Sequence, residues 1–145
     1  MRLNRIMWEP VNGGVTLRVS RNPATVHAPI GGYVHQIAIE PPNELLIISG
    51  QVGRTLDGSV PPDPHDQLAV ALDNLRLQLE AAGMTVADLV KLNYYLVGDT
   101  DAARRAAVIG GFLGTHRPCS TLVYVVALAR PEYLVEVEGW ASAAR

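Results

Sequence analysis

The chain has 145 residues, of which 48% are apolar, and carries a formal net charge of −2 with a sequence pI near 6.0. Its length fits one domain with a single core, and its positive mean hydropathy argues against a disordered chain. The sequence has no basic block interleaved with aromatic residues and no apolar run of the roughly 20 residues that cross a bilayer, so we expect neither nucleic acid nor a membrane as a partner.

Residues that bind metals or form disulfides are sparse. The single cysteine, Cys119, cannot form an intrachain disulfide, which is typical of a protein of the reducing cytoplasm. The four histidines show no zinc-ligand spacing: His27, His35, His65 and His116. We therefore expect a cytoplasmic protein with no metal site and no cofactor.

The first part of the chain predicts an arm followed by a hairpin. Residues 1–30 are punctuated by prolines and glycines, which indicates an extended arm. Apolar residues recur over 33–40, a turn is predicted at 41–43, and the continuous apolar run over 45–49 is typical of a buried strand. These segments together predict a hairpin, and a long loop over 53–64 follows it.

The element with the strongest signals is a helix over residues 64–82. Asp63 provides the N-cap, Pro64 suits the first helical position, and Gly83 ends the pattern. Apolar residues recur at steps of three or four and define one face: Leu68, Leu72, Leu75, Leu79 and Ala82. We expect that face to lie on a sheet.

A third strand and a weaker second helix follow. Polar and apolar residues alternate over 90–97, which predicts a strand, and a helix is expected over 101–113. Near its end, Gly110 and Gly111 each cost the helix about 1 kcal/mol relative to alanine. We therefore expect these glycines to pack closely against another element or another chain.

The last two strands, predicted over 120–128 and 133–141, carry the residues of greatest chemical interest. The period of two along the second strand places Glu136 and Glu138 on one face, so at least one carboxylate faces a solvated cleft or a partner chain. A sheet with one polar face is the alternative interpretation. We expect any chemistry to lie between these two strands. The order of elements predicts an α+β single domain, with a mostly antiparallel sheet and two helices on one face.

Six motifs fall in the order and spacing of one known family: Gly32-Tyr33, Ile48-Ser49-Gly50-Gln51-Val52, Leu72-Asp73-Asn74-Leu75, Leu79-Glu80-Ala81-Ala82-Gly83, Asp88-Leu89-Val90-Lys91 and Leu134-Val135-Glu136-Val137-Glu138. On these motifs the chain resembles the RidA (YjgF/UK) family from about Gly31 onward. We therefore divide it into an extended arm, 1–30, and a RidA-like domain, 31–145. The resemblance implies a chorismate-mutase-like fold assembled as a homotrimer, with the sheets packed inside as a barrel and a small-molecule ligand bound in three clefts between subunits.

The resemblance also implies the residues of the site. In imine-hydrolysing members a glutamate and a glycine position a water molecule, and these correspond here to Glu136 and Gly50. A tyrosine that closes the pocket corresponds to Tyr33. Thr121 corresponds to the residue whose backbone amide helps to hold the substrate carboxylate. The implied catalytic set is therefore Glu136, Gly50 and Tyr33.

Two polar contacts that the resemblance implies are missing from this chain. Cys119 occupies the position of the arginine that binds the substrate carboxylate, and Ala106 aligns with an asparagine that many members carry. A thiol is a weak donor and cannot match the two parallel hydrogen bonds of a guanidinium. Arg117 shares a strand face with Cys119 if the strand begins early, whereas Pro118 favours a loop there. Cys119 is either an inert, partly buried thiol or a nucleophile, and the ligand-binding candidates are Cys119, Thr121 and Arg117.

Three functions from different classes remain open. The first is hydrolytic deamination of a small enamine- or imine-type metabolite, with water positioned by Glu136 and Gly50, in the manner of an enamine/imine deaminase. The second is a non-deaminating family member that binds or tautomerises a small ligand, which the replacement at Cys119 favours. The third is a structural or chaperone-like trimer.

Overall fold

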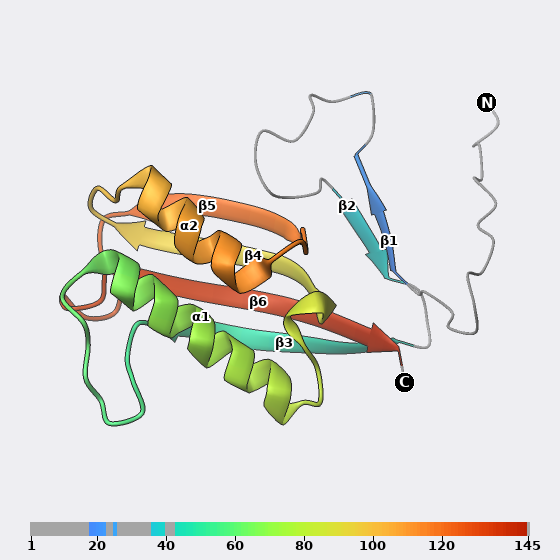
Figure 1. Ribbon diagram of the computed structural model, residues 1–145, viewed down its shortest axis with the longest axis horizontal. Helices are drawn as coiled ribbons and strands as arrows, with labels where there is room; N and C mark the ends of the chain where they lie inside the picture. Colours follow the sequence, from blue (N-terminus) through green and yellow to red (C-terminus); the bar gives the residue numbers. More distant parts are fainter. Residues whose placement is uncertain (1–17, 23–24, 26–35, 40–42, 145) are drawn as a thin grey trace.

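The structure is a computed structural model that describes residues 18–22, 25, 36–39 and 43–144 (Figure 1). Its helices and strands are, in chain order, β1 (Arg18–Arg21), β2 (Gln36–Ile39), β3 (Asn43–Val52), α1 (Pro64–Ala81), the short 3-10 helix η1 (Val86–Asp88), β4 (Leu89–Val97), α2 (Ala102–Leu113), β5 (Cys119–Val125) and β6 (Val135–Ala144). Tyr33 and most of the expected arm lie outside the described residues, so the division into an arm and a domain stays a prediction.

Four of the strands form one mixed sheet in the order β3-β6-β4-β5. β6 is antiparallel to both of its neighbours, and β4 and β5 are parallel. α2 makes the crossover that a parallel pair requires. Both helices cover the same face of the sheet, and no described helix covers the other (Figure 1). The α+β class and the two helices on one face are confirmed.

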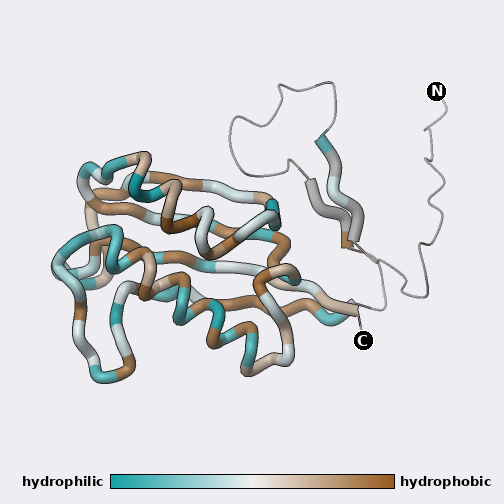
Figure 2. Tube along the Cα trace, viewed as in Figure 1, coloured by the Kyte–Doolittle hydropathy of each residue, from teal (hydrophilic) through white to brown (hydrophobic). Residues whose placement is uncertain are grey.

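α1 is held on the sheet by one continuous apolar face. Hydrophobic and hydrophilic residues alternate along this helix in Figure 2. Four of its leucines are at most 2% exposed: Leu68, Leu72, Leu75 and Leu79. At its N-terminus, Asp63 accepts a hydrogen bond from the backbone N–H of His65 at 2.7 Å, and this bond lowers the pKa of Asp63 to about 2. The predicted cap and the predicted period are both confirmed.

The hairpin expected from residues 33–40 and 45–49 is wrong. Within the described residues, β2 pairs with β1 in a separate two-stranded sheet, and β3 pairs with β6. Ile48 of β3 joins the buried core through this pairing, and Leu46 packs against it. An apolar run indicates that a strand is buried, but it does not say which strand lies beside it.

β5 and β6 are also not neighbours, because β4 lies between them. The strand expected over 120–128 ends at Val125, and residues 126–134 carry the chain past β4. β6 therefore occupies a central position with a hydrogen-bonded neighbour on each side. The expectation that chemistry lies between the last two strands must consequently include the side chains of β4.

The paired glycines of α2 have open space around them. A Cβ built at Gly110 or Gly111 meets no described atom within 4 Å, so these residues do not pack closely against a described element of this chain. We expect Gly110→Ala and Gly111→Ala each to raise the free energy of unfolding by about 0.5–1 kcal/mol, because alanine loses less backbone entropy in a helix. Urea unfolding followed by circular dichroism measures the change.

Gly114→Ala is the matched control for this prediction. Gly114 caps α2 with a φ of 57°, a conformation that strains a residue with a side chain, so alanine here should lower the stability. A loss of stability or of subunit association on alanine substitution at 110 or 111 would contradict the prediction. It would instead indicate packing of these glycines against another chain.

Candidate functional site

The structure brings Gly50 and Glu136 together. The register of β3 and β6 is interrupted between Ile48 and Gln51, so the backbone at Ser49 and Gly50 forms an irregularity in the strand. A Cβ built at Gly50 would lie 1.8 Å from Oε1 and 2.7 Å from Cδ of Glu136. Only glycine leaves room for the carboxylate at this point, and this close approach explains why residue 50 has no side chain.

The second carboxylate, Glu138, is committed to protein donors. Asn93 Nδ2 donates to Glu138 Oε1 at 2.8 Å, and Tyr95 Oη donates to the same oxygen at 2.7 Å. These two bonds lower the pKa of Glu138. The bond to Glu138, together with partial desolvation and the nearby charges of Glu138 and Glu136, raises the pKa of Tyr95. The arrangement keeps Glu138 ionised and fixed in place.

Glu136 differs from Glu138 in this respect. It lies on β6 in register with Tyr95 of β4, and its side chain is half-buried. No hydrogen bond or ion pair joins the Glu136 carboxylate to the residues that the structure describes. Of the two acids that alternation placed on one face, Glu136 is therefore the one whose oxygens remain available to a water molecule or a ligand.

Cys119 and Thr121 form a second group with a residue that sequence reasoning did not select. Both lie on β5, in register with Lys91 and Asn93 of β4. The Lys91 ammonium donates to Thr121 Oγ1 at 2.6 Å, so the cation lies on the same sheet face as these β5 side chains. The alternation over 90–97 already placed Lys91, Asn93 and Tyr95 on one strand face. Only the pairing of β4 with β5 puts Lys91 beside Cys119.

The two groups are well separated within one chain. Glu136 is in register with Tyr95, whereas Cys119 is in register with Lys91. Four residues along β4 span about 13 Å, and β5 and β6 lie about 10 Å apart on opposite sides of β4. The backbones of Cys119 and Glu136 are therefore roughly 16 Å apart, and those of Thr121 and Glu136 are about 12 Å apart, which is more than a molecule of three or four carbons spans.

Arg117 lies in the loop before β5, as Pro118 favoured. Its Nη1 donates to the backbone carbonyls of Gly114 at 2.7 Å and His116 at 2.8 Å. The guanidinium is thus held by its own loop and makes no ion pair with a carboxylate among the described residues. Tyr33 lies outside the described residues, and the structure does not place it.

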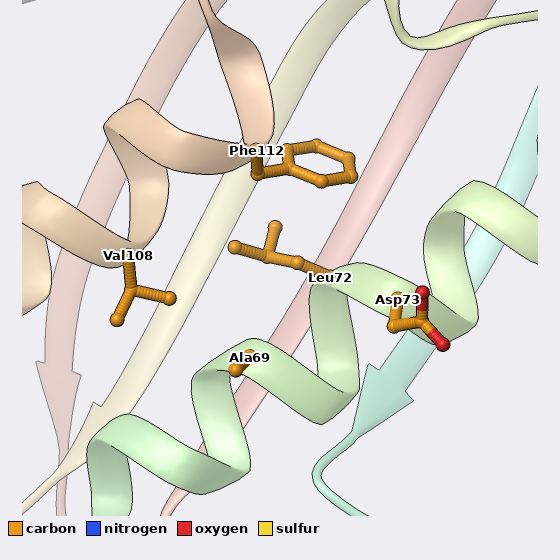
Figure 3. A pocket seen from close by; sticks show the side chains of 5 residues that line it. All are labelled: Ala69, Leu72, Asp73, Val108 and Phe112. Carbon is orange, nitrogen blue, oxygen red and sulfur yellow. The ribbon is translucent and has the colours of Figure 1, made fainter.

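A shallow groove lies between the two helices, on the side of the sheet away from these groups (Figure 3). It is lined by Ala69, Leu72, Asp73, Val108 and Phe112. Its one charged group, Asp73, is paired with Arg76 at 2.7 Å. The groove therefore offers no free polar group for chemistry.

The described part of the chain contains neither a metal-binding cluster nor a membrane-spanning helix. No group of three or more histidine, cysteine, aspartate or glutamate side chains is placed to hold a metal ion. No helix there is long and apolar enough to span a membrane.

Comparisons with known proteins show which family the chain belongs to. The model of the family described as Endoribonuclease L-PSP matches residues 24–143. The chain is 32% identical over 126 residues to the 2-iminobutanoate/2-iminopropanoate deaminase of Escherichia coli, which covers 83% of this chain and 95% of that protein. The solved structure of YyfB from Yersinia pestis, a Rid-family protein of unknown function, matches with a TM-score of 0.76 at 34% identity, over 86% of this chain and 98% of the other. That of Escherichia coli TdcF with bound serine matches with a TM-score of 0.65 at 27% identity, over 80% and 91%. The chain therefore belongs to the Endoribonuclease L-PSP family, which is also called the RidA/YjgF family.

Proposed function

We propose that this protein deaminates a small enamine or imine by hydrolysis, with water positioned by the Glu136 carboxylate and the Gly50 carbonyl. The observation that carries this proposal is the Glu136 carboxylate, which lies against Gly50 without a hydrogen bond to any described residue. Relatives named as imine deaminases, at about 30% identity over most of the chain, support it.

The chemistry requires one group that both accepts and returns a proton. Water adds to the carbon of the protonated imine while Glu136 takes one of its protons, and the Gly50 carbonyl accepts a hydrogen bond from the other. The C=N electron pair moves to nitrogen, so the carbon now carries a hydroxyl and a neutral amine. Return of the proton from Glu136 to nitrogen lets the C–N bond break, and the departing ammonia takes up the hydroxyl proton, which leaves a carbonyl compound and ammonium. A carboxylate not already bound to protein donors suits this cycle, and Glu136 is such a group.

We also propose that the site forms between subunits of a homotrimer with the chorismate-mutase-like barrel arrangement. The separation of roughly 12 to 16 Å between the two groups supports this, because groups that must act on one small molecule would then come from different chains. Exposed apolar side chains on the helix-free face of β3 support it too. Leu45 is 55% exposed and Ile47 is 66% exposed, and a neighbouring chain packed on this face would bury them. A cytoplasmic location remains part of the proposal.

Glu136→Gln tests the proposed reaction. The amide keeps the shape of the side chain but cannot accept the proton, so we expect ammonia release from freshly generated 2-iminopropanoate to fall by about 10² to 10⁴. Light scattering should show an unchanged assembly. Glu132→Gln is the matched control, because this exposed side chain lies 3.9 Å from Arg130 in the connection before β6, outside the strands that carry the candidate site residues. A fully active Glu136→Gln variant would rule out Glu136 as the proton acceptor.

A non-deaminating member that binds or tautomerises a small ligand is the second candidate. The structure favours it in one respect, since the Arg117 guanidinium is held by Gly114 and His116 rather than turned toward the site. Ammonia release from 2-iminopropanoate and from a bulkier 2-imino acid separates the two functions. A RidA-type protein that carries the arginine serves as the positive control, and no release beside an active control would favour the second candidate over deamination.

A further inference from the structure

Lys91 is the only lysine among the twelve lysine and arginine residues of the chain. It lies on β4 with Cys119 as its register partner on β5 and Trp140 as its partner on β6. Its side chain is half-buried on the helix-free face of the sheet. The charged end of Lys91 reaches Thr121, two residues along β5 from Cys119, which the family resemblance aligns with the arginine.

We propose that Lys91 binds the carboxylate of the ligand and, together with Thr121, takes over the role of that arginine. The inference rests on the proposed function for the identity of the site. The inference identifies Lys91 as the residue that makes this chain select an acidic ligand over a neutral one. It also assigns a task to Thr121 that uses its side chain.

The donors at this position match an oxyanion. The Lys91 ammonium has three N–H donors, and one of them is directed to Thr121 Oγ1 at 2.6 Å. Because that oxygen accepts from Lys91, the hydroxyl proton of Thr121 is left to donate elsewhere. Two N–H groups and one O–H group can thus converge on one anion. A single monovalent cation balances one carboxylate, which favours a monocarboxylic acid.

Four arginines of the described residues are already engaged with other protein groups. Arg76, Arg104 and Arg130 each form an ion pair with a carboxylate. Arg105 donates to Thr100 Oγ1 at 2.7 Å and to Tyr124 Oη at 2.9 Å, beside α2. No ion pair within the described ranges includes Lys91, so its charge is not already neutralised by a protein carboxylate there.

The position of Lys91 also fits a site shared between chains. Lys91 and Tyr95, the register partner of Glu136, are four residues apart on β4, which corresponds to about 13 Å. The Lys91 ammonium reaches Thr121, whose backbone is about 12 Å from that of Glu136, and this is still more than a ligand of three or four carbons spans. Lys91 would therefore hold the carboxylate of a ligand whose reacting carbon faces the Glu136 of a neighbouring chain.

Binding of 2-oxobutanoate, a stable acid with the carboxylate of the expected product, tests this inference by calorimetry. We expect Lys91→Met to weaken binding by at least about tenfold, as for the loss of one charge-assisted hydrogen bond, and Lys91→Arg to restore most of it. The neutral analogue 2-oxobutanamide should bind weakly to every variant. Arg76→Met removes a charge from the outer surface of α1 and should leave binding unchanged.

A second measurement does not depend on a variant that folds. Since Lys91 is the one lysine, acetylation of its amine can be followed by mass spectrometry in the native protein, and 2-oxobutanoate should slow it. Equal binding by Lys91→Met, no binding by the wild type, or acetylation unaffected by a bound acid would each overturn the assignment. Ammonia release is scored separately. Lys91-dependent binding without ammonia release would refute the hydrolysis and leave the role of Lys91 standing. Ammonia release with an unchanged KM in Lys91→Met would support the hydrolysis and refute the role of Lys91.

Discussion

Gly50→Ala is expected to lower ammonia release about 100-fold while the protein stays folded and assembled, because small displacements of a catalytic group cost about that much. The added methyl group would lie 1.8 Å from Oε1 of Glu136, so the two cannot keep their positions. The atom in the way is the end of a flexible side chain rather than backbone. The Glu136 carboxylate should therefore swing aside, which costs little stability but removes the proton acceptor from its place.

The same substitution on β6 provides the control. A Cβ at Gly139 would meet the ends of Leu75, Leu92 and Leu89 at 3.2 to 3.4 Å, on the face that packs against the helices. Gly139→Ala should therefore retain most of the activity. In the double variant with Glu136→Gln, the effect of Gly50→Ala should vanish, because both changes act through one carboxylate. A Gly50→Ala enzyme with wild-type turnover would show that the position of Glu136 does not matter for the reaction.

Gln67→Met is expected to produce the largest loss of stability, about 3–5 kcal/mol, because it removes three buried hydrogen bonds at once. Gln67 is only 1% exposed. Its Nε2 donates to the carbonyls of Pro61 at 2.8 Å and Glu132 at 2.9 Å, and its Oε1 accepts from the backbone N–H of Leu134 at 2.8 Å. One side chain thus fastens the loop before α1 and the connection into β6 to the same helix.

Thermal and urea unfolding measure this loss, and the chain offers a matched control. Gln78 lies on the same helix with an exposed side chain, so Gln78→Met should change the stability by no more than about 0.5 kcal/mol. Similar losses in the two variants would mean that the buried hydrogen bonds contribute nothing beyond helix propensity. Because residues 132 and 134 lead into the strand that carries Glu136, a destabilised Gln67→Met protein should lose activity at lower temperature than the wild type.

Several features of the fold and of the candidate site follow from local patterns. Asp63 and the leucine period define α1 because capping and helical repeat act between residues a few positions apart. The alternation of Glu136 and Glu138 with valines places both acids on one face of any strand that they form. Resemblance to a family further grouped Gly50 with Glu136, and the structure places the two in contact distance.

Other features required partners from distant parts of the chain. The apolar run of β3 was matched in sequence to the segment before it, yet its partner is β6, about ninety residues later in the chain. In the sequence, Lys91 is one polar position of an alternating strand, and its neighbours along the chain do not indicate that it lies beside Cys119 or Thr121. Asn93 and Tyr95 acquire their role in the same way, through the register that brings them to Glu138.

The sequence by itself determined the helices, the alternation of the strands and the family, because each of these depends on residues close together or on motifs in a fixed order. Only the tertiary structure decided that β6 lies between β3 and β4, that Glu138 is bound while Glu136 is not, and that Lys91 stands beside Cys119. Strand order and register depend on which distant segments bury the most apolar surface and satisfy the most backbone hydrogen bonds together. That balance is a property of the whole folded chain, and no local pattern contains it.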